Sequence, residues 1–292
     1  MDSLREKAKK LLESGEAGVV IGFRKSESGR SIPFFAKTSS DAEKLIFDPT
    51  CHHILAAFLK KKRIEIKQLG KPAITAKGCD VKALTQLILE SQIKREDVII
   101  LGVRCSGVYK KNADTNLTLS MENMDAKCLT CEVKIPLMYD ELIGNEVNPD
   151  TYSKGEIDMI GALDAMTPEE RFAFWEKEFA KCIRCYGCRQ ACPLCYCEIC
   201  VADKNQPAWI DTSPHSIGNF GWNTIRAMHQ TGRCVGCNAC ERACPMEIPL
   251  YLINRKMAKE IEELFGYKAG LSTTEKPPLT VYNENDDESF IK

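Results

Sequence analysis

Eight cysteines in the second half of the chain form two copies of one pattern. The first copy, residues 182–193, reads C-x2-C-x2-C-x3-C-P, and residues 234–245 repeat it. Cysteine thiolates ligate iron–sulfur clusters, and three cysteines on a tight loop can occupy three iron corners of one cubane. The fourth cysteine of each copy precedes a proline, which directs the chain away from that loop. The spacing therefore predicts two [4Fe–4S] clusters.

The same pattern predicts how the ligands divide between the two clusters. Because the fourth cysteine leaves its own loop, we expect it to bind the cluster of the other copy. Zinc sites usually take paired C-x2-C units, so this spacing argues against zinc. The stretch 181–248 resembles dicluster ferredoxins, apart from a long insertion at residues 194–232. The expected ligand sets are Cys182, Cys185, Cys188 and Cys244 for one cluster, and Cys234, Cys237, Cys240 and Cys192 for the other.

The insertion begins with three further thiols, Cys195, Cys197 and Cys200. They are candidate ligands of a fourth cluster, completed by Cys51 or by a ligand from a partner. The alternative is that they are buried thiols near the second cluster, since free cysteine commonly packs as a small apolar residue. The sequence leaves both interpretations open.

The first half of the chain offers another set of four cysteines. A strand at residues 71–77, a helix at 81–93 and a buried strand at 95–103 predict a βαβ unit in a parallel sheet. Cys79 and Cys105 follow the two strands, at the sheet edge where sites of such folds usually form. Cys128 and Cys131 add a C-x-x-C pair.

Three stretches of this half resemble the beta subunits of deazaflavin-coenzyme-reducing hydrogenase and of the related formate dehydrogenase. They are residues 76–80, 99–107 and 127–136, within a resemblance that spans residues 31–144. The resemblance implies a [4Fe–4S] cluster held by Cys79, Cys105, Cys128 and Cys131, beside a flavin in that family. The segment between Cys105 and Cys128 is much shorter here, and no G-x-G-x-x-G follows a strand. We therefore expect no flavin in this chain.

Composition limits the function classes. The chain has 292 residues, 44% of them apolar and 28% charged, with a formal net charge of −1. No basic excess favours nucleic-acid binding, and no apolar run approaches the roughly 20 residues of a membrane span. The polar N-terminus carries no signal core, and clustered cysteines in a chain of this length indicate metal ligation in a reducing compartment. We expect a cytoplasmic protein.

The expected fold is an α/β N-terminal domain with a cysteine-rich cluster site, followed by a mainly helical dicluster ferredoxin-like domain. The expected boundaries are residues 1–150 for the first domain, 151–180 for a linker and leading helix, 181–270 for the second domain and 271–292 for a flexible acidic tail. Further elements are expected as helices at 3–14, 48–62 and 248–265, a hairpin of strands at 17–25 and 31–38, and a helix that begins after an N-cap at Thr167.

Other candidate residues receive simpler interpretations. We expect His52, His53, His215 and His229 to be surface or capping residues, and Tyr186 and Tyr196 to pack beside clusters. Basic stretches at residues 60–63 and 110–111 most often mark solvated surfaces. Three bound clusters would bring the net charge to about −7, counting a 2+ core and four thiolates each. These basic stretches are then candidate docking surfaces for acidic partners, and charge reversal at Lys61 and Lys62 is expected to weaken association without loss of iron.

These observations favour a non-catalytic iron–sulfur subunit with three [4Fe–4S] clusters. It would pass single electrons between a catalytic subunit of formate dehydrogenase or hydrogenase type and another redox module, such as a heterodisulfide-reductase-like flavoprotein or ferredoxin, in an anaerobic complex. One alternative is a flavin-containing oxidoreductase beta subunit that reduces a deazaflavin or nicotinamide coenzyme. The other, a zinc-dependent structural or nucleic-acid-binding module, is opposed by the neutral charge balance and by the cysteine spacing.

Overall fold

The computed structural model describes residues 2–60, 64–148, 158–282 and 284–285. The chain divides into two compact units, Met1–Gly155 and Glu156–Lys292. Each unit is treated below as a separate body.

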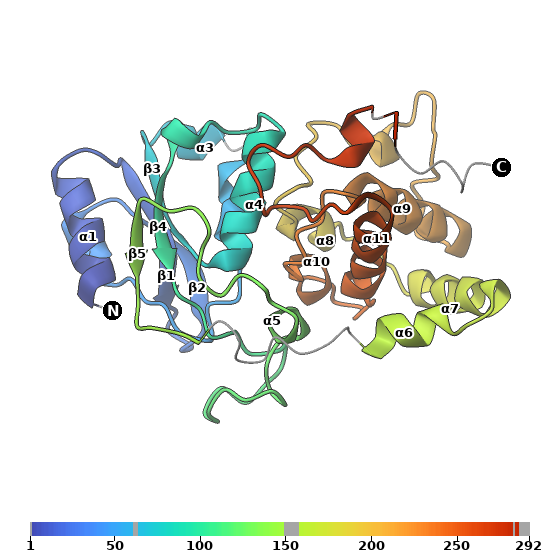
Figure 1. Cartoon of the computed structure of the whole chain (residues 1–292), viewed down its shortest axis with the longest axis horizontal. Coiled ribbons are helices and arrows are strands. Elements are labelled where there is room, and N and C mark those ends of the chain that lie inside the picture. The colour runs from blue at the N-terminus through green and yellow to red at the C-terminus, as the bar shows by residue number, and fades with distance from the viewer. Residues whose placement is uncertain (1, 61–63, 149–157, 283, 286–292) are drawn as a thin grey trace. The chain divides into compact units, whose positions relative to one another are not determined.

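The first unit is built on a five-stranded mixed sheet (Figure 1). Its order is β2-β1-β3-β4-β5, in which β1 and β2 are antiparallel and every other neighbouring pair is parallel. The expected hairpin and βαβ unit are thereby confirmed, as is the α/β class of this unit. The strands are β1 (Val19–Lys25), β2 (Ser31–Ala36), β3 (Pro72–Ala76), β4 (Ile99–Val103) and β5 (Glu141–Ile143).

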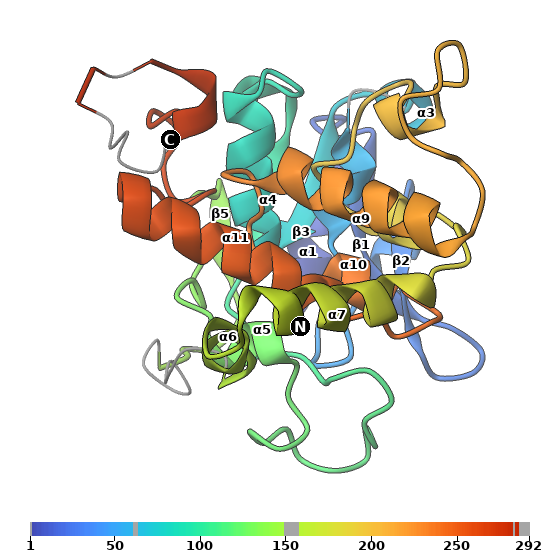
Figure 2. The ribbon, with the colours of Figure 1, turned by 90° about the vertical axis from the view of Figure 1, so that its right-hand side faces the viewer.

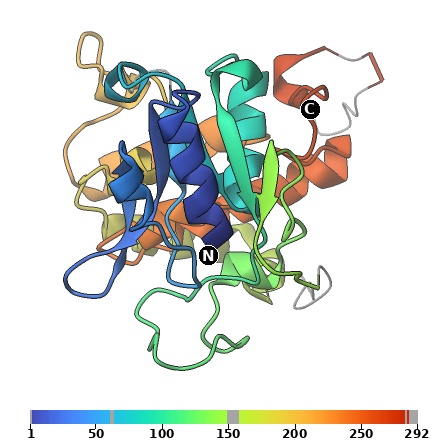
Figure 3. The same cartoon turned by 90° about the vertical axis from the view of Figure 1, so that its left-hand side faces the viewer.

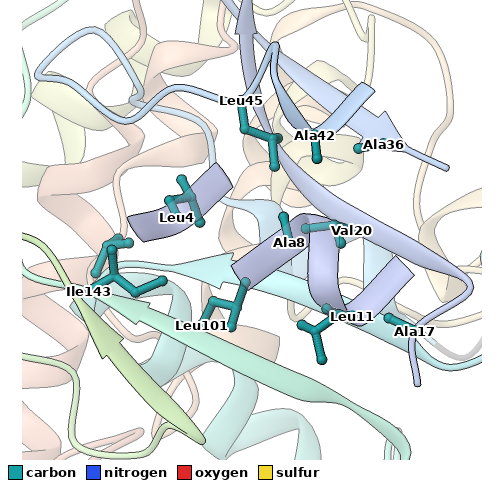
Figure 4. Packing of buried hydrophobic residues seen from close by; sticks show 12 residues of the cluster. Leu4, Ala8, Leu11, Ala17, Val20, Ala36, Ala42, Leu45, Leu101 and Ile143 are labelled. Carbon is teal, nitrogen blue, oxygen red and sulfur yellow. The ribbon is translucent and has the colours of Figure 1, made fainter. Parts of the chain in front are cut away.

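Helices α1 (Asp2–Glu13) and α4 (Gly78–Leu89) cover opposite faces of this sheet. Leu4, Ala8 and Leu11 of α1 follow helical spacing and pack with alternate residues of the strands, such as Val20 and Leu101 (Figure 4). Figure 3 shows α1 lying over one face of the sheet. The shorter helices of this unit are α2 (Ser39–Ala42), η1 (Leu55–Leu59), α3 (Ile64–Lys67), η2 (Arg95–Asp97) and α5 (Ala126–Leu129).

The expected helix at residues 48–62 is wrong. Among the described residues of this stretch, only the short 3-10 helix η1 forms. The reason lies at its start, where the Asp48 carboxylate accepts a hydrogen bond from the backbone N–H of Thr50 at 2.8 Å. This local turn competes with helical hydrogen bonding. Lys60 is also fully buried and so is no part of a solvated patch, whereas residues 61–63 lie outside the described residues.

The second unit is helical in its described residues. Three of its helices exceed ten residues, α7 (Pro168–Ala180), α9 (Ser216–Gln230) and α11 (Leu250–Phe265), and α9 packs against both others (Figure 2). The shorter helices are α6 (Asp158–Asp164), α8 (Gly187–Ala191), η3 (Val201–Asp203), α10 (Ala239–Arg242) and η4 (Pro278–Thr280).

The two long helices expected in this unit, α7 and α11, form at the predicted positions. Thr167 caps α7 in a reciprocal capping box with Glu170, and Pro168 is the first helical residue. Helix α11 ends at Gly266, whose φ of 65° is the left-handed conformation common at helix ends. No helix among the described residues is long and apolar enough to cross a membrane. The first seven residues of the expected linker and leading helix, 151–157, and residues 283 and 286–292 of the expected tail lie outside the described residues.

Candidate metal centres

The first unit brings together the four cysteines that its sequence singled out. Cys79 lies in the first turn of α4, directly after β3, and Cys105 follows β4. Cys128 lies on α5, and Cys131 comes just after it. The pKa of the Cys105 thiol is raised to about 12, mainly by burial and also by the nearby sulfurs of Cys79 and Cys131. Burial also raises the pKa of Cys128, with a further contribution from Cys105. The four sulfurs therefore share one electrostatic environment.

Three buried lysines surround this set of cysteines. Lys77, Lys127 and Lys134 are each no more than 6% exposed. Lys77 Nζ lies 2.6 Å from the Asp80 carboxylate. Burial lowers the pKa of Lys77, but the Asp80 charge and the Cys79 sulfur outweigh that effect and raise it overall. Buried lysines are rare unless an anion compensates them, so this cationic shell fits an anionic group among the four thiols.

The second unit gathers the first expected ligand set around one cavity. This cavity, of about 20 Å³, is lined by Cys182, Cys185, Cys188 and Cys244 together with apolar and aromatic neighbours. The pKa of Cys188 is raised to about 11, mainly by burial and also by the sulfurs of the other three cysteines. The last cysteine of the second copy thus lies with the first three cysteines of the first copy.

The second expected set lies together in the reciprocal way. The pKa of Cys240 is raised to about 12, mainly by burial and also by the sulfurs of Cys192 and Cys234. Cys192 comes from the first copy and the other two come from the second. Asn254 of α11 points its amide at the Cys240 sulfur at 3.9 Å, and Cys237 is buried on the same loop.

The two cysteine loops have the same backbone conformation. The residue directly before the second cysteine is Arg184 in the first loop and Gly236 in the second. Its φ is positive in both, at 57° and 67° respectively. The residue after the second cysteine, Tyr186 or Asn238, repeats this at 57° and 56°. Alternating right- and left-handed residues turn successive backbone N–H groups toward one concave side, which favours anions. Three of these four residues are not glycine, so each loop contains at least one residue whose backbone conformation costs free energy.

Helix α9 is a part of the site that sequence reasoning missed. Asn219 donates to the Cys182 carbonyl at 2.7 Å, and Arg226 donates to the Cys188 carbonyl at 3.3 Å. One turn further, Gln230 donates to the Cys195 sulfur at 3.5 Å. Trp222 packs edge-to-face against Tyr186, with ring centroids 5.5 Å apart. The detectable signal was polar residues at helical spacing inside the insertion.

The additional thiols point in different directions. Cys195 faces Gln230, the charge of Cys200 acts on Arg189, and Cys197 is exposed. Cys51 lies in the first unit, where its sulfur accepts from the Asp48 N–H at 3.4 Å. A fourth cluster on these thiols is therefore a weaker prediction than the three four-cysteine sets.

His215 has the capping role expected of it, and Tyr186 and Tyr196 pack against other side chains. His215 caps α9 by accepting from the Gly218 N–H at 3.4 Å. Tyr186 lines the cavity of the first set. The ring of Tyr196 lies under the Arg233 guanidinium at 5.1 Å.

Within the described residues, no three Cys, His, Asp or Glu side chains converge as ligands of a single metal ion would. A four-iron cubane carries its thiolates on four separate corners, so its ligands need not meet at one point. The buried donor Nε of Arg226 lacks a hydrogen-bond partner among the described atoms. Buried polar groups are normally satisfied, and sulfide or thiolate of a cluster would supply the missing acceptor. The residues present therefore fit [4Fe–4S] groups.

The fold and the cysteine sets direct comparison to the beta subunits of formate dehydrogenases, and the resemblance inferred from the cysteine motifs is confirmed. The chain is 26% identical, over 93% of its length and 90% of the relative, to F420-dependent formate dehydrogenase subunit beta of Methanocaldococcus jannaschii. It is 23% identical, over 93% of its length and 91% of the relative, to F420-dependent formate dehydrogenase 1 subunit beta of Methanococcus maripaludis.

These alignments also show a difference. Each spans 357 positions, whereas this chain has 292 residues, so the relatives carry segments that it lacks. A further relative, acetyl-CoA decarbonylase/synthase complex subunit alpha 1 of Methanosarcina acetivorans, is 31% identical over 62% of this chain but only 20% of its own length. No family model matches the chain.

Proposed function

We propose that this chain is an iron–sulfur electron-transfer subunit of a multi-subunit oxidoreductase, of the kind that contains formate dehydrogenase. The observation that carries the proposal is the crossed gathering of Cys244 with the first loop and of Cys192 with the second. Single metal ions do not require that exchange, whereas two adjacent cubanes held by two copies of this loop do. Similarity to formate dehydrogenase beta subunits over 93% of the chain supports the same function.

The proposed ligands form three sets. They are Cys79, Cys105, Cys128 and Cys131 in the first unit, and the two crossed sets of the second unit. When bound, each [4Fe–4S] cluster accepts and releases one electron. The residues of the chain hold these groups apart from water and set their charge environment, with buried lysines around the first set and α9 against the others.

We further propose that the chain relays electrons between a catalytic subunit of formate dehydrogenase or hydrogenase type and a second redox module, such as a heterodisulfide-reductase-like flavoprotein or a ferredoxin. The names of the relatives favour a formate-oxidising subunit on one side. The described residues carry no nucleophile–base arrangement that we can assign to bond chemistry, so turnover is expected to reside in the partners.

The test is reduction of the chain inside its own complex. The complex is purified without oxygen from the native organism through a tag on this chain, and formate, hydrogen or reduced ferredoxin is added. We expect one of these donors to bleach the broad visible absorption of oxidised clusters within seconds. A complex carrying Cys244→Ser serves as the comparison and should bleach less. If the donors reduce the partner subunits while the clusters of this chain stay oxidised, the relay function is wrong.

The alternative function is reduction of a coenzyme at a flavin on this chain, and the F420-dependent relatives favour it. The segments missing from this chain oppose it. Flavin content of the purified chain separates the two functions. Stoichiometric flavin supports the alternative, and clusters without flavin support the relay.

A further inference from the structure

Arg226 is near cysteines of both sets of the second unit. It is 7% exposed and belongs to α9, in the insertion that separates the two cysteine loops. Its Nη2 donates to the carbonyl of Cys188, a member of the first set, at 3.3 Å. The Arg226 charge also acts on Cys240 and Cys234 of the second set. One buried guanidinium is therefore close to both sets.

The electrostatics of Arg226 agree with this placement. Burial lowers its pKa, but the sulfurs of Cys240, Cys188, Cys195 and Cys192 outweigh burial and raise the pKa overall. A guanidinium stays charged at any relevant pH, so this is a permanent positive charge. Arg255, by contrast, is a cation near the second set. Arg255 of α11 acts on Cys234 and contacts the second loop, where a Cβ at Gly236 would lie 3.1 Å from its Nη1.

We propose that Arg226 is a positioning residue that raises the reduction potentials of both clusters of the second unit together. The inference rests on the proposed function. A cluster that accepts an electron becomes more negative by one charge, and a buried cation nearby stabilises that form. Because Arg226 is near cysteines of both sets, it stabilises reduction of either cluster, and it therefore shifts both potentials in the same direction.

The experiment compares Arg226→Gln with Arg226→Lys and with the control Arg255→Gln, in the full chain purified without oxygen. Iron and acid-labile sulfide are measured first, and the potentials then come from a redox titration followed by electron paramagnetic resonance. For Arg226→Gln we expect unchanged iron content. We also expect the equilibrium constant for reduction of each of the two clusters to fall roughly tenfold or more. Arg226→Lys keeps the charge and should stay within roughly threefold of the original protein. Arg255→Gln should shift one cluster only.

Three outcomes overturn the inference. The first is unchanged potentials in Arg226→Gln with full iron. The second is a shift of the reduction potentials in Arg226→Lys as large as that in Arg226→Gln. That result would show that the planar guanidinium matters and that its charge does not. The third is a shift confined to one cluster. If Arg226→Gln loses iron, the comparison of Arg226→Lys with the original protein decides. Absence of iron and sulfide from the original protein would instead refute the proposed function.

Discussion

Cys188 and Cys244 line the same cavity, although they belong to different copies of the repeated cysteine pattern. Each copy provides three cysteines on a loop and sends its fourth cysteine to the loop of the other copy. Loss of either fourth cysteine should therefore damage the cluster of the other loop. This arrangement makes the two halves of the site depend on each other.

The first prediction concerns Cys244→Ser. A serine there removes one thiolate from the first set, so we expect iron to fall from about 12 to about 8 per chain, or to a residual three-iron form at about 11. The matched control is Cys197→Ser, because Cys197 is exposed and belongs to none of the three sets. Iron and sulfide assays check both variants. Equal iron in the two variants would contradict the crossed assignment.

The second prediction concerns the buried Lys77–Asp80 pair of the first unit, which is 2.6 Å long with both side chains essentially unexposed. Lys77→Met leaves a buried carboxylate without its cation, and we expect a loss of about 3–5 kcal/mol in the free energy of unfolding. Lys44→Met removes an exposed lysine that pairs with Asp41 and should cost less than about 1 kcal/mol. Urea unfolding of both variants measures the difference, and similar losses would show that burial of the first pair is unimportant.

The third prediction concerns backbone conformation in the second cysteine loop. Gly236 has φ of 67°, and a Cβ there would meet Arg255. Gly236→Ala should therefore lower stability by about 1–2 kcal/mol and slow cluster insertion. Gly221, in the middle of α9, has only ordinary contacts around an added Cβ, so Gly221→Ala should raise stability by about 0.5–1 kcal/mol. Thermal unfolding of the two variants should show opposite shifts, and shifts of the same sign would contradict this explanation.

The fourth prediction concerns the capping box of α7. Thr167→Ala removes the side-chain acceptor for the Glu170 N–H, now 3.2 Å away, and should cost about 1 kcal/mol of stability. Thr274→Ala, in an exposed loop, is the control and should have little effect. Chemical denaturation followed by circular dichroism distinguishes them. No difference between the variants would mean that the second unit does not need the cap.

Local signals in the sequence predicted much of this structure. The cap at Thr167, the end of α11 at Gly266 and the buried strand β4 all follow from residues close in sequence. The four cysteines of the first unit were predicted as one ligand set from the resemblance of their motifs to a known family. The sheet topology explains why they lie together. β3 and β4 are parallel neighbours, so Cys79 and Cys105, which follow them, lie at the same edge.

Features that depend on tertiary contacts escaped the sequence analysis. The stretch after Asp48 has apolar residues at helical spacing, but its polar start forms a turn and only η1 follows. Lys60 sits in a basic run, yet packing buries it completely. The role of α9 was missed because the insertion was read for its cysteines, whereas its contacts with the first loop come from Asn219 and Arg226.

The most direct test of the central claim is the content of iron and acid-labile sulfide in the full chain, purified without oxygen. Three [4Fe–4S] clusters require about 12 of each per chain. About 8 would mean that the cysteines of the first unit hold no cluster, and about 16 would assign Cys195, Cys197 and Cys200 to a fourth. Zinc without sulfide would contradict the electron-transfer function altogether.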